Sequence, residues 1–130
     1  MDNNQNAIQN RQKYFWLGKK LEEENALLEA VEAYITYSEH LSESDQHIPH
    51  QWIADIFDNL GELEKSLIYL EKYAIGCSSP VAAEVYKKIG DKYLTISQTE
   101  KAILYYEKAI ENNNSIGIKK KLEELKTGLL

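Results

Sequence analysis

Three histidines in the middle of the chain are the residues most able to hold a metal. His40, His47 and His50 lie close together in sequence, with Asp45 between them. Imidazole and carboxylate groups bind zinc, but a zinc site needs a fixed tetrahedral set of ligands. Because the spacing of these residues follows no metal-binding motif, we expect no metal and no cofactor.

The remaining reactive groups do not form a catalytic set. Cys77 is the single cysteine, and no sequence signature places a histidine beside it as the base of a catalytic thiol. The sequence contains no glycine-rich phosphate loop. The acidic run Glu22–Glu24 is typical of an exposed helix end, and Lys119–Lys121 is too short to indicate nucleic-acid binding. We therefore expect a protein that is not an enzyme.

Two tryptophans could instead bind another molecule. Trp16 lies two residues from Tyr14, about 200° around a helix, and so points away from the face that carries Tyr14. Trp52 stands at the same place in the next segment of the chain. Large aromatic side chains are seldom exposed without a partner, so these two indicate a binding surface.

The helices that would position these residues are clearest in residues 85–112. A first stripe at helical spacing is formed by Tyr86, Ile89, Gly90 and Tyr93. After a break at residues 95–98, a second stripe is formed by Ala102, Ile103, Tyr106, Ala109 and Ile110. Each stripe predicts one helix, and the small residues within them predict that the two helices pack closely.

The same pattern recurs with a period of 36 residues. The clearest columns are Gly18, Ala54 and Gly90, then Leu17, Ile53 and Ile89, then Tyr34, Leu70 and Tyr106. The second copy is the weakest, and there His50 takes the place of Tyr14 and Tyr86. A fixed period predicts stacked helix pairs, each of which buries its apolar face against the next.

These repeats resemble the tetratricopeptide repeat family. The family pattern of aromatic, Leu-Gly and aromatic residues, followed by Ala, aromatic and Ala, is similar to Tyr86, Ile89, Gly90, Tyr93, Ala102, Tyr106 and Ala109. The resemblance implies an all-α, right-handed α-solenoid of antiparallel helix pairs, with about seven helices. It divides the chain into a polar, frayed lead-in (1–10), three repeats (11–46, 47–82 and 83–114) and a C-terminal capping helix (115–130).

In proteins that resemble this one, the first helix of each pair lines a concave groove that binds partner peptides. The resemblance therefore implies that Trp16 and Trp52 are groove anchors and not core residues. The rest of the implied groove is Phe15, Lys19, Asp55, Lys88 and Asp91. The alternative is that the lead-in or the capping helix covers Trp16.

Some three-repeat members of that family bind the tails of heat-shock chaperones with a two-carboxylate clamp. The clamp needs Lys and Asn, then Asn, then Lys and Arg. The corresponding residues here are Phe15, Lys19, Trp52, Glu84 and Lys88. Only Lys88 keeps a suitable charge and Glu84 would repel a carboxylate, so we do not expect a partner of this kind.

Charge is divided unevenly along the chain. Residues 21–71 hold 13 acidic side chains and one lysine, a net −12, whereas residues 72–130 carry +3. The plain interpretation is a solvated helical surface. The sharper one is a bipolar array that orients a charged partner or associates with itself head to tail. The overall net charge of −6 argues against nucleic acid as a partner.

The chain of 130 residues is expected to form one domain in the cytoplasm. No apolar run approaches the about 20 residues of a membrane span, and the N-terminus lacks the apolar core of a signal peptide. We expect a non-enzymatic protein–protein interaction module that binds a protein or peptide and contacts no membrane. Two alternatives remain: an accessory domain of a larger enzyme such as a glycosyltransferase, and a bacterial secretion chaperone.

Overall fold

The chain folds into two compact units, Met1–Gly76 and Cys77–Leu130, hereafter unit 1 and unit 2. The computed structural model describes residues 3–128, so the ends of the expected lead-in and capping segments, residues 1–2 and 129–130, lie outside the described part. The length of the chain predicted one domain. Two units arise because helix pairs of a repeat protein pack on their neighbours and form no single central core.

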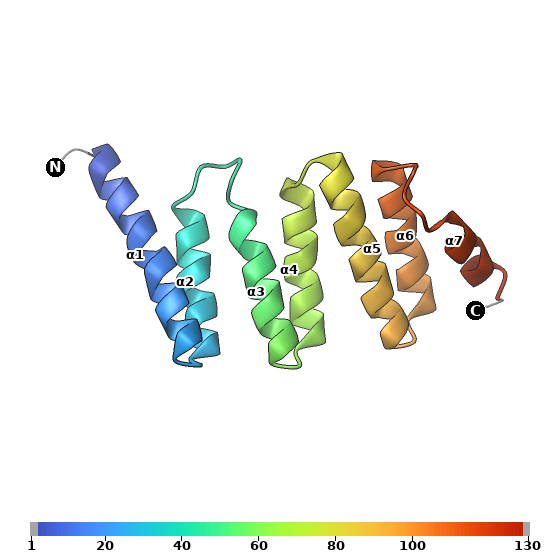
Figure 1. Cartoon of the computed structure of the whole chain (residues 1–130), viewed down its shortest axis with the longest axis horizontal. Helices are drawn as coiled ribbons and strands as arrows, with labels where there is room; N and C mark the ends of the chain where they lie inside the picture. The colour runs from blue at the N-terminus through green and yellow to red at the C-terminus, as the bar shows by residue number, and fades with distance from the viewer. Residues whose placement is uncertain (1–2, 129–130) are drawn as a thin grey trace. The chain divides into compact units, whose positions relative to one another are not determined.

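Every element of secondary structure between residues 3 and 128 is a helix, which confirms the expected all-α fold with seven helices. Unit 1 contains α1 (Asn3–Glu23), α2 (Leu27–Glu39), α3 (Ile48–Asn59) and α4 (Leu63–Gly76). Unit 2 contains α5 (Ser79–Thr95), α6 (Thr99–Asn112) and α7 (Lys119–Lys126). The helices of unit 1 run alternately up and down and pack in chain order, and α5 and α6 form a similar antiparallel pair (Figure 1).

The same turn closes all three helix pairs. Asn25, Gly61 and Ser97 follow one another at the 36-residue period, with left-handed φ angles of 62°, 75° and 58°. The next amide in each case donates to a carbonyl five residues back, as Ala26 does to Leu21 at 2.8 Å. This is the hydrogen bond of a Schellman helix end, so the backbone has the period seen in the sequence.

α1 starts earlier than the sequence suggested. Residues 3–10 belong to the helix, so the expectation of a frayed lead-in is wrong over its described part. The stretch is polar, but its Gln and Ala residues are good helix formers. Ile8 also lies seven residues before Phe15, on the same face of α1, and extends the apolar stripe by two turns.

A glycine–tyrosine contact joins the two helices of the first and third pairs. A Cβ atom on Gly18 would lie 2.3 Å from the Tyr34 ring, and one on Gly90 would lie 2.6 Å from the Tyr106 ring. Both tyrosines are fully buried. The prediction that Gly18 and Gly90 mark close helix contacts is confirmed, because neither site has room for a side chain.

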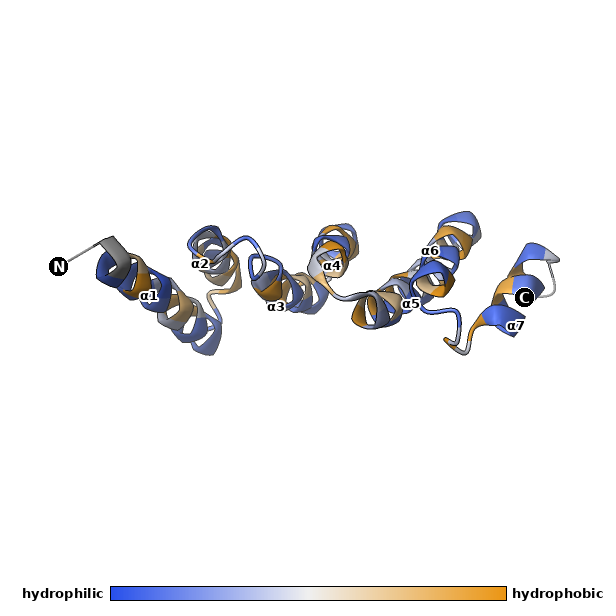
Figure 2. Ribbon diagram, turned by 90° about the horizontal axis from the view of Figure 1, so that it is seen from above, coloured by the Kyte–Doolittle hydropathy of each residue, from blue (hydrophilic) through white to orange (hydrophobic). Residues whose placement is uncertain are grey.

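Each unit has its own hydrophobic core. In unit 1, α2 and α3 contribute Ala30, Val31, Tyr34, Ile53, Ile56 and Phe57. In unit 2, the expected capping residues Ile118, Leu122 and Leu125 are buried together with Ala102, Tyr106 and Ala109. Figure 2 shows hydrophobic and hydrophilic residues on different sides of the helices. Within the described residues, no helix has both the length and the hydrophobicity needed to cross a bilayer.

Candidate functional site

An aromatic cluster joins the first three helices of unit 1. Phe15 of α1 lies 5.5 Å from Tyr37 of α2 and 5.9 Å from Trp52 of α3, measured between ring centroids. Trp52 stacks on Tyr37 at 6.1 Å, with their planes 10° apart, and meets Tyr34 edge-on at 5.4 Å. Trp52 is therefore in contact with both α1 and α2.

Trp52 differs from its expected role as a free-standing anchor. Its side chain is only partly exposed and packs against the core of unit 1. The expectation that Trp52 is not a core residue is therefore wrong for the buried part of its ring. The reason is that its phase on α3 predicts only the direction of the side chain, whereas Phe15 and Tyr37 approach from neighbouring helices and cover part of the ring.

Trp16 is the exposed member of the tryptophan pair. It lies edge-on to Phe15 at 5.1 Å, and 66% of its surface is open to solvent. No part of the described chain covers it, which argues against the alternative that the lead-in or the capping helix shields this residue. An exposed tryptophan beside a partly buried aromatic cluster is a feature of protein binding surfaces.

An apolar cleft lies on the N-terminal side of this cluster. It has a volume of about 270 Å³ and is lined by Ile8, Arg11, Gln12, Phe15, Tyr37 and Leu41. Only Phe15 was expected here from the sequence. Ile8 was missed because residues 1–10 were interpreted as a lead-in, although its seven-residue spacing from Phe15 was a usable signal.

A polar cleft lies on the other side of the aromatic cluster, toward the C-terminal end of α1. Its volume is about 360 Å³, and its lining residues are Lys19, Glu22, Asn25, Leu27, Trp52, Asp55, Ile56 and Asn59. Three of them, Lys19, Trp52 and Asp55, were expected site residues. The Lys19 ammonium lies 5.6 Å from the centroid of Phe15 and 5.5 Å from that of Trp52, so this cation packs over the aromatic cluster.

Tyr34 lies beside the polar cleft, behind Trp52. Its hydroxyl is buried, and its contact with the Glu22 carboxylate falls outside ordinary hydrogen-bond geometry. Burial, followed by the hydrogen-bonding and charge of that Glu22 carboxylate, raises the pKa of Tyr34 above its ordinary value. This corner of the site is therefore polar.

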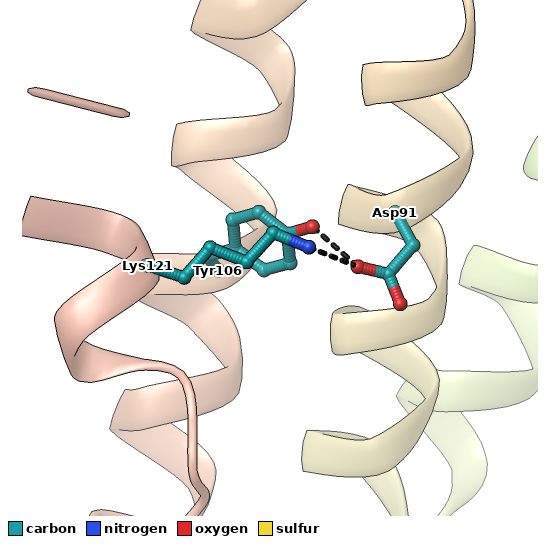
Figure 3. A network of polar contacts seen from close by, with 3 residues as sticks. All are labelled: Asp91, Tyr106 and Lys121. Carbon is teal, nitrogen blue, oxygen red and sulfur yellow. Dashed lines mark hydrogen bonds and ion pairs between the residues drawn. The ribbon is translucent and has the colours of Figure 1, made fainter. Parts of the chain in front are cut away.

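The two expected site residues of unit 2 are placed differently. Lys88 is exposed, but Asp91 is held by contacts inside the unit. The Tyr106 hydroxyl donates to the Asp91 carboxylate, and the Lys121 ammonium of α7 lies 3.3 Å from the same oxygen (Figure 3). Burial and the Asp91 hydrogen bond raise the pKa of Tyr106. Asp91 therefore links α5, α6 and α7.

The three histidines pack against three different tyrosines. His40 lies 5.4 Å from Tyr14, His47 lies 5.6 Å from Tyr73, and His50 lies 5.7 Å from Tyr69. In residues 3–128, no group of three or more His, Cys, Asp or Glu side chains is arranged to hold a metal ion. These imidazoles are packing groups in the structure.

Comparison of the chain with protein family models and with curated protein sequences finds no match. The site combines aromatic surface, two clefts and carboxylates on α1 and α3, which are the parts of a binding surface.

Proposed function

We propose that this chain is a non-enzymatic module of the tetratricopeptide repeat type that binds a segment of a partner protein on unit 1. The binding surface comprises Trp16, the aromatic cluster around Trp52 and the two clefts on either side of it. The 36-residue recurrence of the turn, and the glycine–tyrosine contact shared by the first and third helix pairs, support the family assignment. A single cysteine suits a cytoplasmic setting.

The exposure of Trp16 is the observation that carries this proposal. A tryptophan with 66% of its surface in water gains much by burial against a partner, and tryptophan is enriched among residues that dominate binding energy. Trp16 also contacts Phe15, which lines the apolar cleft. A partner segment that covers Trp16 can therefore reach a preformed cleft with a neighbouring side chain.

Selection from a random peptide display library tests the proposal. The whole chain is immobilised, and recovered peptides are measured by titration against the parent protein and against Trp16→Ala. Loss of a central aromatic anchor should weaken binding by about 2 kcal/mol or more, roughly thirtyfold.

Leu28→Ala is the matched control, because Leu28 is also a large exposed side chain of unit 1 and lies outside both clefts. It should leave binding unchanged. If no peptide is recovered, or if Trp16→Ala binds every recovered peptide as tightly as the parent does, unit 1 does not have this function.

A further inference from the structure

The polar cleft has two carboxylates and one cation, Lys19, in its lining. Glu22 and Asp55 line it, and neither forms an ion pair with any other residue that the structure describes. The amide groups of Asn25 and Asn59 add further hydrogen-bond acceptors. Residues 21–71, from which nearly all of the lining comes, have a net charge of −12. The cleft is therefore suited to a cationic side chain.

The Trp52 wall of the cleft already has a cation packed on it. The Lys19 ammonium lies 5.5 Å from the centroid of Trp52, within the range of a cation–π contact. Lys19 makes no ion pair within the described residues. A second cation that also reached Glu22 and Asp55 would make contacts that Lys19 does not.

Unit 2 contains a tyrosine, a carboxylate and a lysine that contact one another. There the Lys121 ammonium lies 5.4 Å from the centroid of Tyr106, the counterpart of Tyr34, and 3.3 Å from the Asp91 carboxylate. The Tyr106 hydroxyl donates to that carboxylate (Figure 3). In unit 1, the buried Tyr34 hydroxyl lies against the Glu22 carboxylate. Unit 1 has Lys19 at the position equivalent to Asp91, and its carboxylate comes from Glu22, one helical turn further along α1. No lysine forms an ion pair with Glu22 within the described residues.

We propose that the polar cleft of unit 1 binds an arginine side chain of the partner segment, while the apolar cleft binds a bulky apolar side chain of the same segment. This inference rests on the proposed function, since it names the chemistry of that partner. Arginine fits better than lysine because its planar guanidinium stacks on aromatic rings and donates to several acceptors at once.

The distance between the clefts sets the spacing of the two partner residues. On α1, the apolar cleft is centred near residue 12 and the polar cleft near residue 21. At 1.5 Å per residue these centres are about 14 Å apart along the helix axis. An extended peptide rises about 3.3 Å per residue, so the arginine and the apolar residue should be about four positions apart.

A panel of short Gly/Ser peptides tests this inference. Each peptide carries one phenylalanine and one arginine, in both orders and at spacings from adjacent to about six residues, the reach set by strand geometry. The quenching of Trp16 and Trp52 fluorescence reports binding. A spacing near four should bind best, and replacing its arginine by neutral, isosteric citrulline should weaken binding about fivefold.

Variants of the cleft separate local contacts from overall charge. Asp55→Asn and Glu22→Gln should each weaken the arginine peptide about threefold and leave the citrulline peptide unchanged. Lys19→Met should strengthen the arginine peptide, because it removes the internal competitor. Glu29→Gln makes the same charge change outside both clefts and should have no effect.

The outcomes distinguish the two proposals. Equal binding of arginine and citrulline peptides, or no binding by any peptide of the panel, overturns the arginine inference. The proposed function still stands in that case if display peptides bind and lose affinity with Trp16→Ala. If those peptides also fail, both proposals fall together.

Discussion

Units 1 and 2 share one contact between paired helices and differ in the polar residues next to that contact. In both, a glycine on the first helix admits a buried tyrosine from the second, at Gly18 and Tyr34 and again at Gly90 and Tyr106. In unit 2 the tyrosine hydroxyl is satisfied by a carboxylate that is itself paired with a lysine. In unit 1 the hydroxyl lies against Glu22, which has no ion-pair partner among the described residues, and a cleft lies next to it. The same scaffold thus carries a paired carboxylate in unit 2 and an unpaired carboxylate beside a cleft in unit 1.

Replacing either glycine should give the largest effect and should do so in both units. A leucine at Gly18 or Gly90 would overlap a fully buried ring, because even a Cβ lies 2.3 Å or 2.6 Å from the tyrosine. We expect each change to cost about 3 kcal/mol in urea unfolding followed by circular dichroism.

Gly117→Leu is the control for this pair, since a Cβ at Gly117 meets no atom within 4 Å. It should be near neutral. A Gly18→Leu or Gly90→Leu protein as stable as the parent would mean that the shared contact does not hold the helix pairs together.

The two tryptophans of unit 1 should differ in their effect on stability. Trp52→Ala should cost about 2 kcal/mol, less than the 3–5 kcal/mol of a fully buried aromatic residue, because Trp52 is partly exposed. Trp16→Ala should stay within about 0.5 kcal/mol, as expected for a surface change. Urea unfolding of both variants gives the comparison, and the reverse order would contradict the placement of the two rings.

Removing the tyrosine hydroxyls should affect the two units to different degrees. Tyr106→Phe loses the hydrogen bond to Asp91 and should cost about 1 kcal/mol, a modest value because Asp91 is half exposed. Tyr34→Phe removes a buried hydroxyl whose contact with Glu22 falls outside ordinary hydrogen-bond geometry, so it should be close to neutral. Thermal unfolding can measure both, and equal losses would show that the hydroxyls are equally satisfied.

The smallest expected effect is the pH dependence that His50 gives to the stability of unit 1. Burial, followed by the charges of Lys72 and His47, lowers the pKa of His50. The unfolded chain therefore takes up the proton first as the pH falls. The stability that His50 contributes is complete above its unfolded pKa of about 6.5 and is lost as the pH falls through the folded pKa.

His50→Tyr should remove this part of the pH dependence, because tyrosine occupies the equivalent position in the other repeats. The measurement is the free energy of unfolding from mildly acidic to neutral pH. A variant whose stability changes with pH as steeply as that of the parent would show that His50 is not the group responsible.

The sequence predicted the repeated features of the molecule better than the contacts between distant residues. The 36-residue period, the Gly18 and Gly90 contacts and the exposure of Trp16 follow from helical phase, which is a local property. The partial burial of Trp52 does not, because it depends on how closely Phe15 and Tyr37 approach.

Asp91 shows the same limit. It lies on the face that the repeat pattern assigns to a groove, yet Lys121 reaches it from a helix 30 residues further along the chain. A phase argument on α5 contains no information about the side chains of α7. The apolar cleft was not predicted for a different reason. Its first residue, Ile8, lies in a stretch that is helical although its polar composition did not indicate a helix.

Nuclear magnetic resonance of the ¹⁵N-labelled chain tests most directly whether a peptide binds on unit 1 and not on unit 2. The tightest peptide from the display selection is added, and the indole N–H signals of Trp16 and Trp52 are followed together with the backbone amides. We predict shifts at both indoles and at residues 8–22 and 52–59, with α5, α6 and α7 unchanged. Shifts concentrated around Lys88 and Asp91, with both indoles unmoved, would contradict the account.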